Sequence, residues 1–483
     1  MRGKAQSGQA ILVVLLALSL VMVGAMGLAV DGAQLFAHQQ MAQAAADAAA
    51  QAGVMSLFDN TSGWGGHAAP TVGATFTCTT GSDAAAPCVY ARSNGFSNSA
   101  ADSVVVSFPD PASGYGATVT SGVSLSSDPV KLIKVQVQRT VQNGLLRFLG
   151  PATQIVQATA VAAIVSVLQP TPILVSHPNL SGALSVGGSA SITICGGPSR
   201  SIQVNSSSPT AVSVGTVDLS KAGPLDSGTC TTGTGADFAV HGGPTAKPGG
   251  INLGTAGNYV QPSSIMQDPL ASVPEPANPI TPGTQTVVHN PTNGCPVANC
   301  TLYSPGLYTS YLQIKNDTAL FEPGLYYMQG GFGNAANGNI QMATGVANNA
   351  VTGAGMVMYI TGNGTIDLTA NASAVMRGSD TTSIYKGILF FVDRRPATQN
   401  AQTHTLGHGN SQITIVGTVY ANDSNANALA GNYQTIALGG TGGSGTTITG
   451  MIITNVLTMI GTPAVTMNLS STNLTIRSIA LIH

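Results

Sequence analysis

An uncharged apolar segment near the amino terminus constrains the fold more than any other feature. From Ala10 to Val30 the chain reads AILVVLLALSLVMVGAMGLAV, 21 residues without a charged side chain. As a helix rising about 1.5 Å per residue, this segment would span about 30 Å, the thickness of a hydrocarbon core. We therefore expect a retained transmembrane helix at residues 10–30, and a removed secretory signal peptide is the alternative.

The charges on either side of this segment predict its orientation. Arg2 and Lys4 precede it, and Asp31 is the first charged residue after it. The positive-inside rule therefore places residues 1–9 in the cytoplasm as a short tail, and everything beyond about Asp31 outside the cytoplasm.

The next stretch, residues 31–58, continues as an alanine-rich helix former that is broken only by Gly32 and Gly53. Asp47 is the only charge in its interior, whereas a solvated helix normally carries more. Its small faces are therefore expected to pack closely, either on a partner helix or on the chain's own downstream domain. The residues predicted for the partner contact are Ala45, Ala46, Ala49 and Ala50.

Three local patterns resemble the amino-terminal module of the TadG-like Flp pilus-assembly proteins (the TadE/TadG-like family). They are Gly8-Gln9-Ala10 at the start of the apolar run, Asp31-Gly32 after it, and the AAADAAA run at residues 44–50. The resemblance covers about the first 60 residues and implies a single-pass protein of the bacterial inner membrane, with pilin-like or secretion-machinery partners. Type IV prepilins also have a glycine before an apolar helix, but Val13 replaces their acidic residue, so an uncleaved anchor is expected.

Residues 59–168 are expected to form a small α/β module outside the cytoplasm. Period-two alternation, clearest in Ile133, Val135 and Val137, indicates strands. The expected strands are residues 103–108, 131–140 and 154–165, and residues 145–149 are expected to form a short helical turn.

Residues 170–483 show short apolar–polar alternations separated by Gly, Asn and Ser, with internal repeats. Ala-Leu-Ser-Val at 183–186 returns as Ala-Val-Ser-Val at 211–214, and Pro-Gly-Leu-Tyr at 305–308 recurs at 323–326. Repetition of this kind favours a β-solenoid, with a right-handed parallel β-helix expected and a Greek-key sandwich as the alternative. The overall fold class is therefore α+β: a long helix with a small α/β module, then a mainly-β region.

A proline-rich stretch interrupts the solenoid at about residues 223–300. Proline at this density disfavours regular strands, so a long surface crossing between two solenoid parts is expected there. Two further blocks also resemble the large carboxyl-terminal regions of long TadG-like proteins: residues 268–276 and 387–394.

All six cysteines follow the apolar segment, in the compartment where disulfides persist. Pairing by sequence proximity is the simplest of the possible connectivities, and each bridge would contribute about 2–3 kcal/mol. The expected pairs are Cys78–Cys88, Cys195–Cys230 and Cys295–Cys300. The spacings do not fit a metal site.

The sequence carries no motif of a common active site, so we expect no enzyme and no cofactor. A net charge of −2 with only 7% charged residues argues against nucleic-acid binding. His404 and His408 are four residues apart, but the segment reads as a loop, so no metal site is expected. The only candidates for a carbohydrate-processing site are Asp367, Asp380, Asp393, Arg394, Arg395 and Asp423, of which residues 393–395 are expected to form a local salt-bridged turn.

Two functions therefore stay open. One is a non-enzymatic, membrane-anchored assembly or accessory protein of a Tad (Flp) pilus, and the other is a surface adhesin or carbohydrate-binding β-helix with a pilin-like anchor. A carboxylate or aromatic row repeating at the spacing of the solenoid would favour glycan binding. We find no such row in the sequence, which favours the first function.

Overall fold

The computed structural model divides the chain into two compact units, which are described separately. Unit 1 comprises Met1–Ser166 and Arg477–His483, and unit 2 comprises Val167–Ile476. The structure describes residues 5–58, 64–79, 81–97, 99–114, 123–126, 128–144, 147, 150–168, 171–223, 230–231, 233–279, 281–344, 355–369, 373–379, 384–395, 399–407, 412–440, 445–469 and 475–482. The predicted helical turn at residues 145–149, apart from Arg147, lies outside these ranges, as do His408 and Asp380.

Unit 1 is built on one long helix, α1 (Ala5–Phe58), of 54 residues. The apolar run and the alanine-rich stretch therefore form a single helix, as their uninterrupted helix-forming composition predicts. Neither Gly32 nor Gly53 breaks it, because a lone glycine costs only about 1 kcal/mol in a helix interior.

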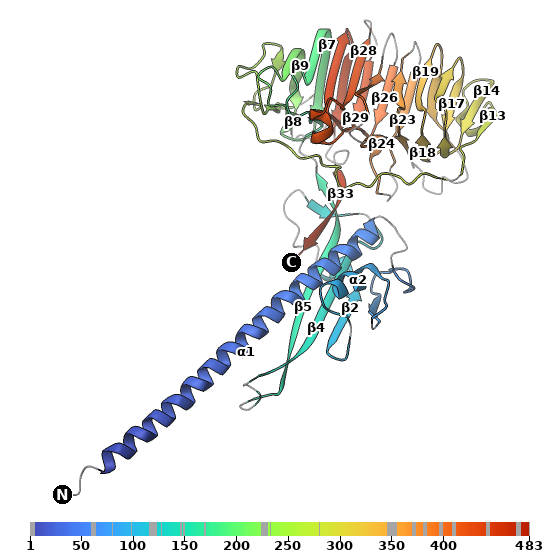
Figure 1. Ribbon diagram of the computed structural model, residues 1–483. Helices are drawn as coiled ribbons and strands as arrows, with labels where there is room; N and C mark the ends of the chain where they lie inside the picture. Colours follow the sequence, from blue (N-terminus) through green and yellow to red (C-terminus); the bar gives the residue numbers. More distant parts are fainter. Residues whose placement is uncertain are drawn as a thin grey trace. The chain divides into compact units, whose positions relative to one another are not determined.

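An antiparallel sheet packs on this helix (Figure 1). Its strands are β1 (Thr75–Thr77), β2 (Asp102–Ser107), β4 (Leu132–Gln142), β5 (Thr153–Leu168) and β3 (Val123–Leu125), in that order. The face of β4 that carries Ile133, Val135 and Val137 is buried, as the alternation predicts. The unit also contains the short helix α2 (Ala86–Ser93) and the 3-10 turn η1 (Pro111–Ser113).

The last strand, β33 (Thr475–Ile482), pairs with β5 and belongs to unit 1 from Arg477 onward. The single region expected at residues 170–483 therefore ends earlier, because residues 477–483 belong to unit 1. Arg477 forms a buried ion pair with Asp128 at 2.8 Å, and its guanidinium lies 4.9 Å from the ring of Phe58. Both partners are distant from Arg477 in sequence, so no local sequence pattern predicts that the last strand joins unit 1.

Unit 2 consists mainly of short parallel strands. They are β6 (Ile173–Val175), β7 (Leu184–Gly196), β8 (Arg200–Val204), β9 (Val212–Ala222), β10 (Asp237–Val240), β11 (Ile251–Asn252), β12 (Tyr259–Val260), β13 (Gln285–His289), β14 (Asn299–Tyr303), β15 (Gly306–Tyr308), β16 (Leu312–Lys315), β17 (Thr318–Phe321), β18 (Gly324–Met328), β19 (Gly331–Ala335), β20 (Asn339–Met342), β21 (Met356–Ile360), β22 (Thr365–Leu368), β23 (Ser373–Arg377), β24 (Ile388–Val392), β25 (Gln402–Leu406), β26 (Gln412–Val416), β27 (Thr418–Ala421), β28 (Gln434–Gly440), β29 (Gly445–Thr449), β30 (Ile452–Thr454), β31 (Val456–Gly461) and β32 (Ala464–Leu469). A single turn of helix, α3 (Asn425–Leu429), and the 3-10 turn η4 (Thr292–Gly294) complete the described elements.

From β14 to β29, each strand pairs in parallel with the strand three positions further along the chain. One ten-stranded sheet runs in the order β12-β10-β8-β6-β30-β27-β24-β21-β18-β15. Two other stacks follow the same rule, β14-β17-β20-β23-β26-β29-β32 and β16-β19-β22-β25-β28-β31. Parallel pairing of this kind differs from the antiparallel ladders that a Greek-key sandwich requires.

The internal repeats in the sequence correspond to neighbouring strands. Leu184 pairs with Val212 and Val186 with Val214, so the first repeat stacks in register. The second repeat also lies on neighbouring strands, but Gly306 pairs with Tyr326, two residues out of register. Gly417 and Gly450 occupy equivalent corners, where a Cβ on Gly450 would lie 2.2 Å from the carbonyl oxygen of Gly417. Only glycine fits such close backbone contact.

The chain begins unit 2 in the middle of the ten-stranded sheet, fills one half outward, and then fills the other half inward from the opposite end. It proceeds from β6 to β12, then crosses to β15 at the other end, and returns through β18 to β30, which pairs with β6. Residues 261–279, here called the crossing segment, contain no strand. The predicted crossing is therefore present, but it is shorter than residues 223–300, because β10 to β13 lie within that range.

Candidate functional site: a groove between α1 and α2

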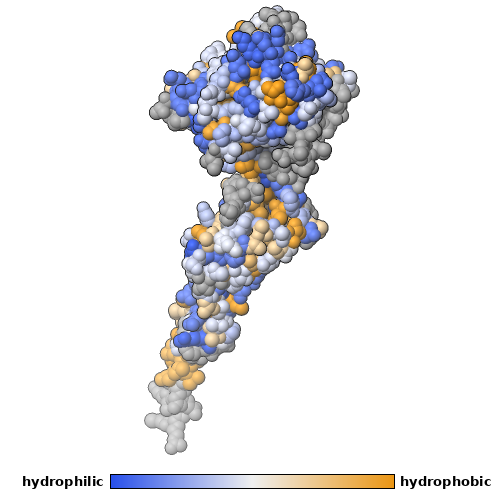
Figure 2. Space-filling view, turned by 90° about the vertical axis from the view of Figure 1, so that its right-hand side faces the viewer, coloured by the Kyte–Doolittle hydropathy of each residue, from blue (hydrophilic) through white to orange (hydrophobic). Residues whose placement is uncertain are grey.

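The amino-terminal half of α1 exposes its apolar side chains (Figure 2). Eighteen consecutive residues of this helix reach a mean hydropathy of 2.8, and only 6% of them are buried. Residues such as Leu12, Val21 and Met26 are 60–66% exposed. Within the described residues this helix is long and apolar enough to cross a membrane.

Asp31 marks the change from this exposed half to a half that is packed on the sheet. Its side chain is 3% exposed, and its Oδ1 accepts a hydrogen bond from Gly144 N, just after β4, at 3.0 Å. Further along, Gln39 Nε2 donates to Gln157 O of β5 at 2.9 Å. The β4–β5 hairpin therefore lies along one side of α1 from Asp31 onward.

The alanines predicted to contact a partner helix lie on this packed side. Ala45, Ala46, Ala49 and Ala50 are each 0% exposed, because α1 packs on β4 and α2 within the same unit. Between the two arrangements that the sequence left open, the structure therefore selects packing on the chain's own domain. The partner contact predicted at these four residues is wrong: a charge there would disrupt the core of unit 1.

The other side of α1 carries a groove of about 480 Å³ that α2 completes. No charged residue lines it. Its α1 side is formed by Ala48, Gln51, Ala52, Met55 and Ser56, and its α2 side by Ala86 and Tyr90. The ring of Tyr90 is 53% exposed. Sequence reasoning missed this face, because the alanine run alone does not show which of its members the sheet covers.

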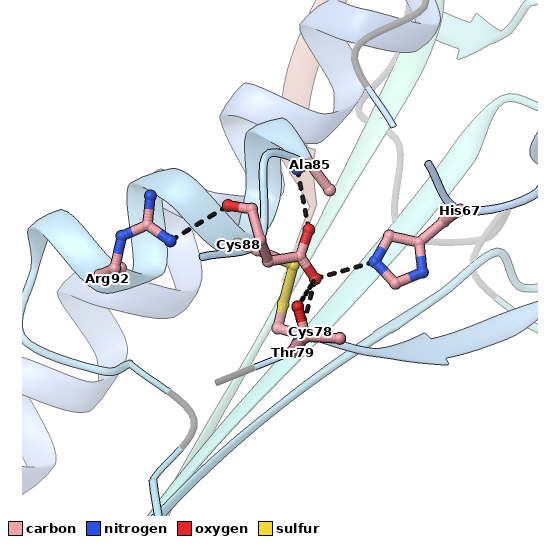
Figure 3. The surroundings of a disulfide bond; sticks show 7 residues. His67, Cys78, Thr79, Ala85, Cys88 and Arg92 are labelled. Atoms are coloured by element: carbon pink, nitrogen blue, oxygen red, sulfur yellow. Dashed lines mark hydrogen bonds and ion pairs between the residues drawn. A yellow bond between two sulfur atoms is a disulfide. The ribbon is translucent and has the colours of Figure 1, made fainter. Parts of the chain in front are cut away.

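The Cys78–Cys88 disulfide fixes α2 at the groove (Figure 3). Cys88 lies on α2 between Ala86 and Tyr90, and Cys78 directly follows β1, so the bridge ties the helix to the end of that strand. Arg92 Nη1 donates to the carbonyl oxygen of Asp83 at 3.1 Å. The disulfide at Cys88 therefore holds Ala86 and Tyr90, which lie on either side of it in α2, in place at the groove.

Asp83 orders the start of α2. Its Oδ1 accepts from Ala85 N at 2.9 Å, and its Oδ2 accepts from Thr79 N at 2.8 Å and lies 2.8 Å from His67 Nε2. Burial acts to raise the pKa of Asp83, but these hydrogen bonds and the nearby His67 outweigh it and lower the pKa. Asp83 thus stays ionised at neutral pH.

His67, Asp83 and Cys88 also lie close enough to suggest a metal site. The sulfur of Cys88 is bonded to Cys78, however, so it is not a thiolate and cannot serve as a metal ligand. Of this cluster, His67 and Asp83 could then still bind a metal, and two ligands are fewer than the three or four that a protein zinc site uses. The cluster is better explained by its hydrogen bonds at the start of α2.

The helix that carries the groove is also the part of the chain that matches a known family. Residues 8–56 match the family Tad, described as Flp pilus-assembly TadE/G-like. The match covers nearly the whole of α1 and confirms the resemblance expected for the amino-terminal module. No curated protein and no solved structure matches the chain.

Outside the TadE/G-like helix, unit 2 contains an aromatic row that the sequence analysis did not find. Tyr327, Tyr359, Phe391 and Tyr420 pair in register on four consecutive strands of the ten-stranded sheet. Neighbouring rings lie 5.0–5.7 Å apart. The expectation that no such row exists was therefore wrong, because residues 29 to 32 positions apart align only once the strands are paired.

The crossing segment covers most of this aromatic row. Its Leu270 and Val273 are 1% and 2% exposed. Tyr420 donates to Asp268 Oδ2 at 2.7 Å, and Arg394 Nη1 donates to Val273 O at 3.0 Å while lying 5.2 Å from the Phe391 and Tyr420 rings. Tyr359, Phe391 and Tyr420 are at most 2% exposed as a result, and Tyr327 is half-buried. The row is therefore part of the core.

The charged residues considered for carbohydrate chemistry are dispersed or used structurally. Arg395 forms an ion pair with Asp423 at 2.8 Å, and both side chains are 0% exposed. This pair joins neighbouring strands of the stack and replaces the local salt-bridged turn predicted at residues 393–395. Asp393 accepts from Thr361 Oγ1 at 2.8 Å and from Gly362 N, while Asp367 lies on β22.

His404 lies on β25 and not in the loop expected from the sequence. Its side chain is 0% exposed, with Nδ1 accepting from Ile366 N at 3.2 Å and Nε2 lying 2.8 Å from the side-chain amide of Gln434. Burial first, and then the charge of Arg395, lowers the pKa of His404 to about 4. It is therefore a neutral core residue.

The other two disulfides lie in unit 2. Cys195 at the end of β7 is bonded to Cys230, and Cys295 after η4 is bonded to Cys300 on β14. Together with Cys78–Cys88, these are the three pairs expected from sequence proximity, and no free cysteine is found among the described residues.

Proposed function

We propose that this chain is a membrane-anchored, non-enzymatic assembly or accessory protein of a Tad (Flp) type IV pilus or a related secretion system. The observation that carries the proposal is the coincidence of two independent features on α1. Residues 8–56 match the TadE/G-like family, and the same helix exposes an apolar half of membrane-spanning length. A helix in a soluble core would have buried that half.

The proposed topology places the amino terminus in the cytoplasm and both units outside it. Arg2 and Lys4 provide the positive side, and three disulfides favour an oxidising compartment for the units. The membrane would be the inner membrane of a bacterium, as the resemblance to TadG-like proteins leads us to expect.

We further propose that unit 2 is a right-handed parallel β-helix displayed outside the cytoplasm. Three stacks in which every third strand pairs in parallel are what three-sided coils of chain would produce. Connections between parallel strands are almost always right-handed, which supports the handedness. Such a unit would be a rigid platform for pilus or secretion-machinery proteins.

The absence of catalysis is also a proposal, and it is supported by how the ionisable groups are used. Asp423 and Arg395 neutralise each other in the core, Asp268 and Arg394 hold the crossing segment, and Asp83 orders α2. Each forms hydrogen bonds or an ion pair within the fold, although Asp268, Arg394 and Asp423 also border a hollow of about 240 Å³. A catalytic carboxylate would instead need a partly free oxygen facing a cleft.

The experiment is to replace residues 10–30 with a cleavable signal peptide and to compare the released protein with the full chain. We expect the full chain to fractionate with the inner membrane and to support Flp pili, and the released form to fold without restoring pili. A released form that restores pili fully would contradict anchorage as part of the function. Normal pili in a strain lacking the gene would contradict the pilus role itself.

A further inference from the structure

The groove between α1 and α2 is an uncovered apolar surface on an otherwise well-packed unit. Its α1 side continues toward the membrane-spanning half through side chains on the same face. Met55, Ala52, Ala48, Ala44 and Met41 are separated by three or four residues, which places them in one line along the helix. Met41 is 46% exposed and Ala44 is exposed, so the line is open along its length.

The occupant of this groove must be able to follow α1 from the membrane. The line of small and apolar residues on α1 leads directly into the exposed apolar half of the same helix. In lipid, a neighbouring single span must be helical, since all its backbone groups need internal hydrogen bonds. A helix that leaves the membrane beside α1 therefore reaches the groove without a bend. A soluble protein could contact only the part of α1 that lies outside the membrane.

A second copy of α1 fits the charge and size of this surface. The only Asp, Glu, Lys or Arg residues between residues 5 and 58 are Asp31 and Asp47, and neither lines the groove. Asp31 is buried against Gly144, and Asp47 accepts from Gln43 Nε2 at 2.8 Å on a neighbouring face. Two parallel copies would therefore meet without like-charge repulsion, and alanines spaced by four residues permit close approach of the helix axes.

We propose that the groove is the self-association site of this chain, occupied by α1 of a second copy that lies parallel in the same membrane. Membrane insertion fixes both copies in the same orientation, so a two-fold contact can bring Ala48 of one copy beside Ala48 of the other. Tyr90 of α2 then covers the contact between the two α1 helices. The proposal rests on the membrane anchorage in the proposed function, but it does not require a pilus.

The test is disulfide crosslinking of the full chain reconstituted in phospholipid vesicles. Because all six native cysteines are paired, Ala48→Cys introduces the only free thiol. We expect Ala48→Cys to form a covalent dimer under mild oxidation, several-fold more than the matched variant Gln43→Cys on the polar face. Adding Ala52→Glu should reduce the dimer several-fold, while Ala48→Cys with Gln43→Glu should retain it.

Fluorescence of the single tryptophan, Trp64, which is 7% exposed in unit 1, shows whether each variant is folded. Equal crosslinking of Gln43→Cys and Ala48→Cys in folded protein would overturn the proposal, as would a dimer that Ala52→Glu does not reduce. Each of these results would leave the pilus role and the membrane anchorage to be judged by the fractionation and pilus assays.

Discussion

Gly53 of α1 lies directly against Ile133 of β4: a Cβ added to Gly53 would be 2.3 Å from Ile133 Cδ1 and 3.2 Å from Pro87 Cγ. Ile133 is 0% exposed, so its side chain has no free space into which to move. The helix therefore approaches both the sheet and α2 so closely that any side chain at position 53 must displace the end of Ile133. This contact fixes which side of α1 is covered and which side faces the groove.

The first prediction follows from this contact. Gly53→Leu should destabilise unit 1 by about 1–3 kcal/mol, because overpacking a filled core outweighs the gain in helix propensity. Trp64 fluorescence during denaturant unfolding reports this unit alone. Gly32→Leu is the matched control, since nothing lies within 4 Å of a Cβ there, and it should be neutral or stabilising. Equal losses for the two variants would contradict the packing described.

The second prediction concerns the disulfide beside the groove. Replacing Cys78 and Cys88 with serine should lower the unfolding free energy of unit 1 by about 2–3 kcal/mol, because the unfolded chain is no longer constrained. Hydrogen exchange at α2 should accelerate more than exchange at β4, since only α2 loses its tether. Unchanged protection of α2 would show that Asp83 and its hydrogen bonds hold the helix without the bridge.

The third prediction is a pH dependence of unit 2. The folded pKa of His404, about 4, lies below the ordinary value of 6.5, so between these values the unfolded chain binds a proton that the folded chain does not. The contribution of His404 therefore weakens unit 2 as the pH falls from 6.5 toward 4, by up to about 1.4 kcal/mol per pH unit.

Other buried groups titrate in this range, so the comparison must isolate His404. Burial lowers the pKa of His177, which acts in the same direction, and burial raises the pKa of Asp393, which acts in the opposite one. Native-state hydrogen exchange of unit 2 should show a smaller slope against pH in His404→Gln than in the native chain. Identical slopes would contradict a neutral, buried His404.

The sequence predicted those features of the fold that depend on local patterns. The apolar and alanine-rich stretches specify α1, and alternation in Ile133, Val135 and Val137 specifies β4. The repeats at residues 183 and 211 lie on stacked strands, because similar coils have similar sequences. Cysteines close in sequence form the three bridges, since short loops bring them together most often.

Features set by distant contacts could not be read in this way. Which alanines of α1 are covered depends on β4 and α2, and β33 joins unit 1 through Arg477 and Asp128. The groove was missed because it requires residues of two helices that are separated by a loop. In unit 2, the aromatic row becomes visible only when the strand register is known.

The fourth prediction concerns the buried ion pair. Asp423→Asn should destabilise unit 2 by about 3–5 kcal/mol, because it leaves the guanidinium of Arg395 uncompensated in the core. The double variant Arg395→Met with Asp423→Leu should lose less than the single one, since no charge is then buried. Hydrogen exchange of unit 2 measures both. A loss in the double variant equal to the sum of the losses in Arg395→Met and Asp423→Leu alone would argue against a direct pair.

The last prediction separates a structural aromatic row from a glycan-binding one. Because the crossing segment covers Phe391, Phe391→Ala should destabilise unit 2 by about 3–5 kcal/mol, while Tyr327→Ala, at a half-buried position, should cost less. Phe391→Leu should largely preserve the fold, and neither it nor the native chain should bind immobilised oligosaccharides. Oligosaccharide binding by the native chain that Phe391→Leu abolishes would mean that the crossing segment opens, and would favour the carbohydrate-binding function over a covered core.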